Sequence, residues 1–271
     1  MTILLTAGNG KTGRRIAARL DALGIPVRLG SRSGTPPFDW ADPATWPAAL
    51  SGVDAAYVNY VPDLAVPDAP KAIETFTAEA ARQGVRRLVL LSGRGETEAE
   101  RCERIVQANA PEWTIVRCSW FAQNFSEDYL LADVLDGTIR VPVTDVREPF
   151  VDVDDIADVA VAALTDPRHT GQLYELTGPR ALTFAEAAAE IAAASGRSVG
   201  FESVSIDDYA AGLRAAEYPE DVIWLVTYLF TEVLDGRNEA VRDGVQRALG
   251  RPAKDFAEYA KGAAESGAWA E

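Results

Sequence analysis

The stretch Thr6–Arg15, "TAGNGKTGRR", allows two interpretations of the chain. Its segment Gly10-Lys11-Thr12 matches the end of a P-loop, whose pattern G-x-x-x-x-G-K-[ST] binds a nucleoside triphosphate. That pattern requires a glycine at position 5, where this chain has Leu5. Leu5 belongs to the apolar run "ILL", which predicts a buried strand. The spacing therefore excludes a P-loop.

The same stretch also contains the spacing Gly8-x-Gly10-x-x-Gly13, between a predicted strand and a predicted helix with Ile16 and Leu20 at helical spacing. In a dinucleotide-binding fold the first glycine permits the tight turn, the second lets the backbone approach a pyrophosphate, and the third lets the helix pack on the strand. The pyrophosphate then faces the unpaired N–H groups of the helix start. We expect cofactor contacts from Gly8, Asn9, Gly10, Lys11, Thr12 and Gly13; a plain tight turn is the alternative.

The composition limits the partners of the chain. Its 271 residues carry a net charge of −15, so the surface should repel nucleic acid and anionic membranes. An apolar run of about 18 residues, which a membrane span needs, is absent. The first strand leads directly into the glycine turn, so we expect no signal peptide. Cys102 and Cys118 give no disulfide framework and predict buried thiols in a reduced cytoplasmic setting.

Strands and helices alternate along the first 125 residues. Strands are expected within 1–6, 25–32, 54–62, 85–93 and 112–121, and helices within 13–24, 68–84 and 96–109. This alternation predicts an α/β fold of the Rossmann type, a doubly wound parallel sheet with helices on both faces.

The pattern loosens after Phe125, and the chain becomes mostly helical from about residue 205. Thr183 and Glu186 form a capping box at the start of one helix, which Gly196 ends. We expect an NAD(P)-binding Rossmann domain over 1–165 and a smaller, mostly helical substrate-binding lobe over 166–271, with segment 126–138 packing with the lobe. The ligand is expected between them, at the carboxyl ends of the strands.

Several longer stretches carry a family resemblance. They are "TAGNGKTGRRIA", "FDWADPATWPAAL", "VRRLVLLSGRGE", "WTIVRCSWFAQNFSE", "PFVDVDDIADVA" and "YELTGPRALTFAEAA". With them the chain resembles the NmrA-like branch of the atypical short-chain dehydrogenase/reductases, and within it actinobacterial NAD(P)-binding proteins related to festuclavine dehydrogenase. The branch contains imine, quinone and enone reductases, and also cofactor-sensing regulators.

The end of the second strand indicates the cofactor. An NAD site usually has an acid there, which accepts a hydrogen bond from the ribose hydroxyl. This chain instead has Ser31, Arg32 and Ser33, and arginine matches a phosphate with planar, charge-assisted bonds. NADP-preferring relatives also place an arginine here. We therefore expect NADP(H) as the preferred cofactor, with NAD(H) as the alternative; a solvated turn arginine is the other explanation.

The resemblance implies further cofactor contacts. Asp39 and Trp40 would lie near the adenine, although turn chemistry around Pro36 explains them equally well. The other contacts follow the third, fourth and fifth strands: Asn59, Tyr60 and Val61 along the ribose, Ser92 and Gly93 near the nicotinamide ribose, and Ser119, Trp120 and Phe121 with backbone groups at the carboxamide. Relatives often have proline where this chain has Cys118-Ser119.

The catalytic residues are not identified by the sequence. Orthodox short-chain reductases use Tyr-x-x-x-Lys as a proton donor, and none of the eight tyrosines here has lysine four residues later. Hydride transfer does not require that motif, because the nicotinamide carries the chemistry. Its absence favours an activated acceptor over a simple ketone. Ser92, Tyr60 and Tyr129 are weak proton-donor candidates, with local hydrogen bonding or packing as their alternatives.

These observations predict an NADPH-dependent reductase of a small conjugated imine, enone or quinone, with a redox sensor without turnover as the alternative. The protein would be a monomer or a homodimer. The substrate pocket is expected to contain Trp120, Phe121, Asn124, Phe125, Tyr129, Phe150, Trp224 and Tyr228. His169, the only histidine, is expected to be a solvated loop residue, and no metal-ligand spacing is present.

Overall fold

The computed structural model describes residues 1–270, which form two compact units. Unit 1 comprises Met1–Cys118, Val153–Leu176 and Asp243–Arg251, and unit 2 comprises Ser119–Asp152, Thr177–Arg242 and the residues from Pro252 onward. Each unit is therefore built from separate pieces of the chain. Segments 166–176 and 243–251, which lie beyond the expected boundary at residue 165, belong to unit 1.

Unit 1 contains a six-stranded parallel sheet with the order β2-β1-β3-β4-β5-β8. Its strands are β1 (Ile3–Thr6), β2 (Val27–Gly30), β3 (Ala55–Val58), β4 (Arg87–Gly93), β5 (Glu112–Cys118) and β8 (Gln172–Leu176). The predicted parallel sheet is confirmed. Because the strand order reverses between β1 and β3, loops leave the sheet in opposite directions there, which is where such folds bind ligands.

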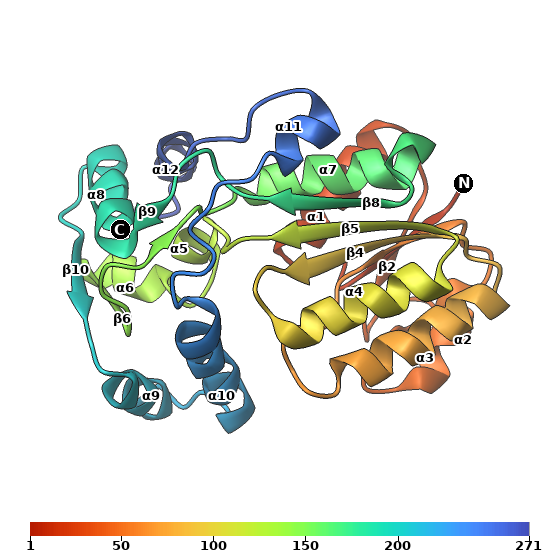
Figure 1. Cartoon of the computed structure of the whole chain (residues 1–271), viewed down its shortest axis with the longest axis horizontal. Helices are drawn as coiled ribbons and strands as arrows, with labels where there is room; N and C mark the ends of the chain where they lie inside the picture. The colour runs from red at the N-terminus through yellow and green to blue at the C-terminus, as the bar shows by residue number, and fades with distance from the viewer. Residues whose placement is uncertain (271) are drawn as a thin grey trace. The chain divides into compact units, whose positions relative to one another are not determined.

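Helices cover both faces of this sheet (Figure 1). The α3 and α4 helices lie on one face, and α7 and α11 lie on the other, where α1 packs against α7. The helices of unit 1 are α1 (Lys11–Ala22), α2 (Trp46–Leu50), α3 (Ala69–Arg82), α4 (Thr97–Asn109), α7 (Val153–Thr165) and α11 (Gly244–Leu249), with short 3₁₀ turns η1 (Pro43–Thr45) and η2 (Pro167–His169). The sheet is doubly wound, as the alternation predicted.

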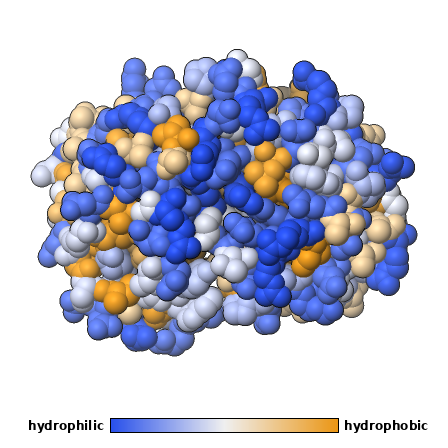
Figure 2. All heavy atoms as spheres, viewed as in Figure 1, coloured by the Kyte–Doolittle hydropathy of each residue, from blue (hydrophilic) through white to orange (hydrophobic). Residues whose placement is uncertain are grey.

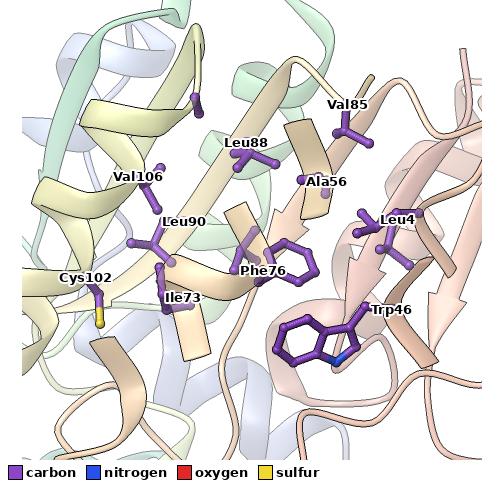
Figure 3. Packing of buried hydrophobic residues seen from close by; sticks show 14 of the residues in the cluster. Leu4, Trp46, Ala56, Ile73, Phe76, Val85, Leu88, Leu90, Cys102 and Val106 are labelled. Carbon is purple, nitrogen blue, oxygen red and sulfur yellow. The ribbon is translucent and has the colours of Figure 1, made fainter. Parts of the chain in front are cut away.

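The core under α3 and α4 follows from strand periodicity, because alternate side chains of a strand point to the same face. Leu88 and Leu90 of β4 both enter this core, where Trp46 packs edge-on against Phe76 with ring centroids 5.7 Å apart (Figure 3). Cys102 of α4 is fully buried in the same cluster. Burial raises the pKa of its thiol to about 12, so the expected inert thiol is the state that the structure supports.

Unit 2 joins two small sheets to six helices. The parallel pair is β6 (Thr138–Val141) with β10 (Gly200–Ser203), and the antiparallel pair is β7 (Arg147–Glu148) with β9 (Leu182–Thr183). The helices are α5 (Asn124–Glu127), α6 (Leu131–Asp136), α8 (Phe184–Ser195), α9 (Ile206–Ala215), α10 (Glu220–Tyr228), which continues into a π-helical turn η3 (Leu229–Val233), and α12 (Phe256–Glu265).

The surface of the protein is mainly hydrophilic on the face that Figure 2 shows, as expected for a chain with 25% charged residues. On the face shown in Figure 2, hydrophilic residues predominate and hydrophobic ones are scattered in small groups. In residues 1–270, no helix is long and apolar enough to cross a membrane.

The α8 helix begins with the capping box that the sequence predicted. The Thr183 hydroxyl accepts a hydrogen bond from the backbone N–H of Glu186 at 3.1 Å, and the Glu186 carboxylate accepts one from the N–H of Thr183 at 2.8 Å. Two backbone donors that the helix leaves without partners are satisfied in this way.

We expect Thr183→Ala to lower the free energy of unfolding by about 1 kcal/mol, because one helix-end N–H loses its acceptor. Thr183→Ser keeps the hydroxyl and should stay close to wild type. Urea unfolding followed by circular dichroism measures both variants. Equal stability of the alanine and serine variants would contradict this role of the capping box.

Candidate functional site

The glycine turn joins the end of β1 to the start of α1. Ala7 has a left-handed backbone with φ of 53°, and its carbonyl accepts a hydrogen bond from the N–H of Gly10 at 3.0 Å. Gly10 is the N-cap residue of α1, where no side chain caps the helix and the first turn carries no acid. A helix start without a side-chain cap or an acid is a position that favours an anion.

The third glycine of the turn has no room for a side chain, and the first has little. A Cβ atom on Gly13 would lie 2.6 Å from the carbonyl oxygen of Ala7 and 2.7 Å from that of Gly8. A Cβ atom on Gly8 would lie 2.9 Å from a methyl carbon of Leu29. The helix packs on the turn itself, which is the role that the third glycine has in dinucleotide-binding folds.

Arg32 follows β2 and is exposed. The loop around it closes through the carbonyl of Ser31, which accepts hydrogen bonds from the N–H groups of Gly34 at 3.0 Å and Phe38 at 2.8 Å. Within residues 1–270 the Arg32 guanidinium has no hydrogen bond and no ion pair, so the loop does not depend on it. Ser33 beside it is also exposed. A cation without a structural partner at this strand end is available to bind a phosphate.

Asp39 is occupied by the turn in which it lies. Its carboxylate accepts a hydrogen bond from the N–H of Ala41 at 3.0 Å, and its carbonyl accepts one from the indole of Trp46 at 2.7 Å. Turn chemistry therefore explains Asp39. The Trp40 indole N–H donates a hydrogen bond to the carbonyl of Asn59 at 3.0 Å. Its ring packs edge-on against that of Tyr60, with ring centroids 5.0 Å apart.

The loop after β3 is tied to the end of β1. The Thr6 hydroxyl accepts a hydrogen bond from the N–H of Asn59 at 2.7 Å and donates to the carbonyl of Asn59 at 3.1 Å. The Asn59 amide lies 3.5 Å from the hydroxyl of Thr12, in the first turn of α1. Val61 is 52% exposed. The structure thus brings Asn59 and the glycine turn together at the point where the strand order reverses.

Ser92 is buried at the end of β4, and its hydroxyl donates to Glu103 at 2.6 Å. Arg117 holds the same carboxylate from β5, with its Nε 2.8 Å from a Glu103 oxygen. The proton of Ser92 is committed to a buried carboxylate. This placement favours the local hydrogen-bonding explanation of Ser92 over the proton-donor explanation.

Two acids beside the predicted cofactor residues were missed by sequence reasoning. Glu96 follows β4 and is 7% exposed, and its carboxyl group lies against Gly93 and hydrogen-bonds to Asp63 from the loop after β3. Burial and the nearby acids raise the pKa of Glu96 well above its usual range, and burial raises that of Asp63. The available signal was an acid within five residues of the ends of two adjacent strands.

The turn after β5 uses its own backbone groups. In unit 2 the Ser119 hydroxyl donates to the carbonyl of Pro149 at 2.6 Å, and the N–H of Trp120 donates to Glu148 at 3.1 Å. The carbonyl of Trp120 accepts from the N–H of Val151 at 2.9 Å. These backbone groups were expected to hold the carboxamide, but those of Trp120 already have protein partners; Phe121 pairs with Val151 in an isolated bridge.

The expected pocket residues, all in unit 2, fall into three groups. Phe125 and Phe150 are 0% and 2% exposed and pack against one another in its aromatic core, a placement that does not support a pocket role. The Trp120 indole N–H and the Tyr129 hydroxyl are buried next to one another, with Asn124 also buried beside Tyr129. The exposed Trp224 stacks on Tyr228 with ring centroids 5.5 Å apart.

The expectation that His169 is solvated was wrong. His169 is 4% exposed, its Nδ1 lies 2.8 Å from the hydroxyl of Tyr174, and its carbonyl accepts a hydrogen bond from Thr114 at 2.7 Å. The loop after α7 folds against the strands β5 and β8, which removes the ring from water. Among residues 1–270, no group of three or more histidine, cysteine or acidic side chains could hold a metal ion.

A parallel sheet whose first strand runs through three glycines into a closely packed helix defines a Rossmann protein of the dinucleotide-binding class. The free guanidinium after β2 lies at the same edge of the sheet, because the carboxyl ends of parallel strands meet there.

Known proteins resemble the chain along nearly its whole length. It is 34% identical to the uncharacterized oxidoreductase YesF of Bacillus subtilis, covering 98% of this chain and 96% of that protein. It is 31% identical to an NAD(P)H azoreductase of Xenophilus azovorans, with 96% of each chain covered. It is also 31% identical to agroclavine dehydrogenase of Claviceps fusiformis, with the same coverage. The chain belongs to the NmrA-like branch of the atypical short-chain dehydrogenase/reductase family.

Solved structures share the fold. A triphenylmethane reductase from Citrobacter in complex with NADP(H) has a TM-score of 0.77 at 19% identity, covering 97% of this chain and 100% of that chain. NmrA, a negative transcriptional regulator in complex with NAD, has a TM-score of 0.71 at 16% identity, covering 96% of this chain and 94% of that chain. A search of protein-family models gave no match.

Replacing Gly13 with alanine should destabilise the protein by about 1–3 kcal/mol, because the new Cβ meets two backbone carbonyls that cannot move independently. Gly262→Ala in α12 is the matched control, since nothing lies within 4 Å of its Cβ position. That variant should be neutral or more stable by about 0.5–1 kcal/mol. Thermal unfolding of both variants measures the difference, and an equally stable Gly13→Ala protein would contradict the close packing of α1 on the turn.

Proposed function

We propose that the protein is an NADPH-dependent reductase that transfers hydride to a small conjugated organic acceptor, an imine, an enone or a quinone. Its membership of a family of named reductases and dehydrogenases makes it an NAD(P)H-dependent oxidoreductase that acts on a small molecule. The observation that carries the choice of cofactor is Arg32, whose guanidinium follows β2 without a protein partner in the described chain.

The residues of unit 1 fit NADP(H). The uncapped first turn of α1 and the glycine turn would hold the pyrophosphate, since their N–H groups have no side-chain partner. Arg32 would bind the 2′-phosphate, with the hydroxyls of Ser31 and Ser33 beside it. The Asn59 backbone, fixed by Thr6, would guide the ribose.

The chemistry supports an activated acceptor. The bound nicotinamide supplies the hydride, and the chain itself contributes binding, orientation and exclusion of water. Tyr60 and Tyr129 are not followed by a lysine at the fourth position, so neither has the neighbour that makes tyrosine an efficient acid. Iminium ions and quinones accept hydride readily, so their reduction does not depend on a Tyr-x-x-x-Lys pair.

Substrate recognition is assigned to unit 2. The Trp120 indole and the Tyr129 hydroxyl are buried polar groups that lie next to one another, and Phe230 packs against Trp120 with ring centroids 5.3 Å apart. A carbonyl or imine atom on a flat apolar molecule would accept a hydrogen bond from one of these donors. The exposed stack of Trp224 on Tyr228 would contact the flat face of such a molecule.

Arg32→Ala should weaken NADPH binding about 10- to 100-fold, because a charge-assisted contact to the 2′-phosphate is lost. NADH affinity should stay unchanged, since NADH lacks that phosphate. Isothermal titration calorimetry with each cofactor measures the change. Arg104→Ala on α4 is the matched control, because that side chain is 63% exposed and its ion pair with Glu100 is 3.9 Å long.

Equal losses of affinity for NADPH and NADH in Arg32→Ala would contradict the assignment of Arg32 to the 2′-phosphate. Wild-type protein is then screened with quinones, enones and cyclic imines for NADPH consumption. Tight NADPH binding without consumption of any acceptor would contradict the reductase proposal and favour a cofactor sensor.

A further inference from the structure

Asp63 and Glu96 form a pair of acids at the carboxyl ends of β3 and β4. Asp63 is fixed by its loop, because its Oδ1 accepts a hydrogen bond from the N–H of Ala65 at 2.8 Å. Glu96 is the N-cap residue of α4, yet its side chain makes no capping hydrogen bond. Instead the two carboxyl groups hydrogen-bond to each other. Two carboxylates in such contact cannot both be ionised, so the pair holds a shared proton.

The position of the Glu96 carboxyl group is set by Gly93. A Cβ atom on Gly93 would lie 1.8 Å from the Glu96 Oε1, so the acid occupies the volume that any other residue there would fill. Glu96 is 7% exposed, and its Oε2 has no hydrogen-bond partner in residues 1–270. A buried carboxyl oxygen without a partner is costly unless another molecule supplies one.

The groups around Glu96 all favour its protonated form. Asp63 and Glu103 are the charged groups that act on Glu96, and both raise the pKa of its carboxyl group. Glu96 in turn raises the pKa of the Cys118 thiol at the end of β5 and that of Cys102 on α4. No cation is among the groups that shift the pKa of Glu96. The backbone N–H of Ala65 favours the ionised form of Asp63, so the shared proton is expected on Glu96.

We propose that the Asp63–Glu96 pair is the proton donor of the reductase, with Glu96 protonating the acceptor as hydride arrives. This inference rests on the proposed function. The position of Glu96 supports this role, because its carboxyl group touches Gly93, and Gly93 is expected at the nicotinamide ribose. The pair supplies the acid that the absent Tyr-x-x-x-Lys motif leaves missing.

The step balances for a quinone. The quinone gains two electrons and one hydrogen as hydride, which NADPH supplies as it becomes NADP⁺. The O–H bond of Glu96 breaks, a new O–H bond forms on the reduced acceptor, and Glu96 is left as a carboxylate. Asp63 and solvent then return a proton to Glu96. A cyclic iminium ion needs only the hydride, because its charge is neutralised by that transfer.

The two acceptors provide the test. Glu96→Gln keeps the shape of the side chain but has no proton to give, so it should slow quinone reduction about 10²-fold or more. Reduction of a cyclic iminium ion by the same variant should stay within a few-fold of wild type, as should NADPH affinity. Glu100→Gln, on the same helix and with a 45% exposed side chain, is the matched control and should behave as wild type with both acceptors.

A second measurement needs no cofactor. The raised pKa values of Asp63 and Glu96 mean that the folded protein binds a proton more tightly than the unfolded chain. The resulting stabilisation is fully present below the ordinary carboxyl pKa and is lost as the pH rises through the raised value in the folded state. Unfolding with urea across this pH range should show that loss in full in wild type and in Glu100→Gln, and a smaller loss in Glu96→Gln, where only Asp63 keeps a raised pKa.

The outcomes separate the two proposals. If wild-type protein reduces a quinone no faster than Glu96→Gln does, the proton-donor role is overturned and the reductase proposal still stands. If none of the acceptors leads to NADPH consumption, both the reductase proposal and the proton-donor proposal are overturned. The stability curves then still decide whether the pair holds a shared proton. If Glu96→Gln does not fold, Asp63→Asn serves instead. In that variant Glu96 ionises more easily, so the rate of quinone reduction should begin to fall at a lower pH than in wild type. An unmoved pH profile in that variant would overturn the role.

Discussion

The close packing of Gly13 on the carbonyls of Ala7 and Gly8 is the contact on which the arrangement of unit 1 depends. It fixes the first turn of α1 against the end of β1, so that the uncapped start of the helix lies at the edge where the strands end. The Thr6 hydroxyl then binds the loop after β3 to the same point. The geometry of this edge is thus set by close backbone packing and by the buried hydroxyl of Thr6.

The sequence predicted the features that have local causes. The parallel sheet follows from alternating apolar strands and amphipathic helices. Thr183 caps the start of α8 because the capping box is a local pattern of four residues. The glycine turn was recognisable because its spacing is fixed by backbone geometry. The buried environment of His169 was not recognisable, because it depends on Thr114 and Tyr174, which only the folded sheet brings to that loop.

The assignment of site residues was limited by the same cause. Ser92 and Glu103 meet only because α4 covers β4, so the commitment of the serine proton cannot be read from the strand itself. The single boundary expected at residue 165 could not anticipate a chain that returns to the sheet with β8 and α11. Phe125 and Phe150 follow strands as pocket residues do, yet the tertiary fold closes them into an aromatic core.

A shared proton between two acids also suits the charge of the site. The phosphates of a dinucleotide bring negative charge to this edge of the sheet, and the protein as a whole already has a net charge of −15. Two ionised carboxylates at the ends of β3 and β4 would repel that cofactor, whereas a pair that retains one proton carries a single negative charge. In the proposed reductase, burial would serve two requirements together: it limits repulsion while the cofactor binds, and it keeps on Glu96 the proton that a quinone would take up.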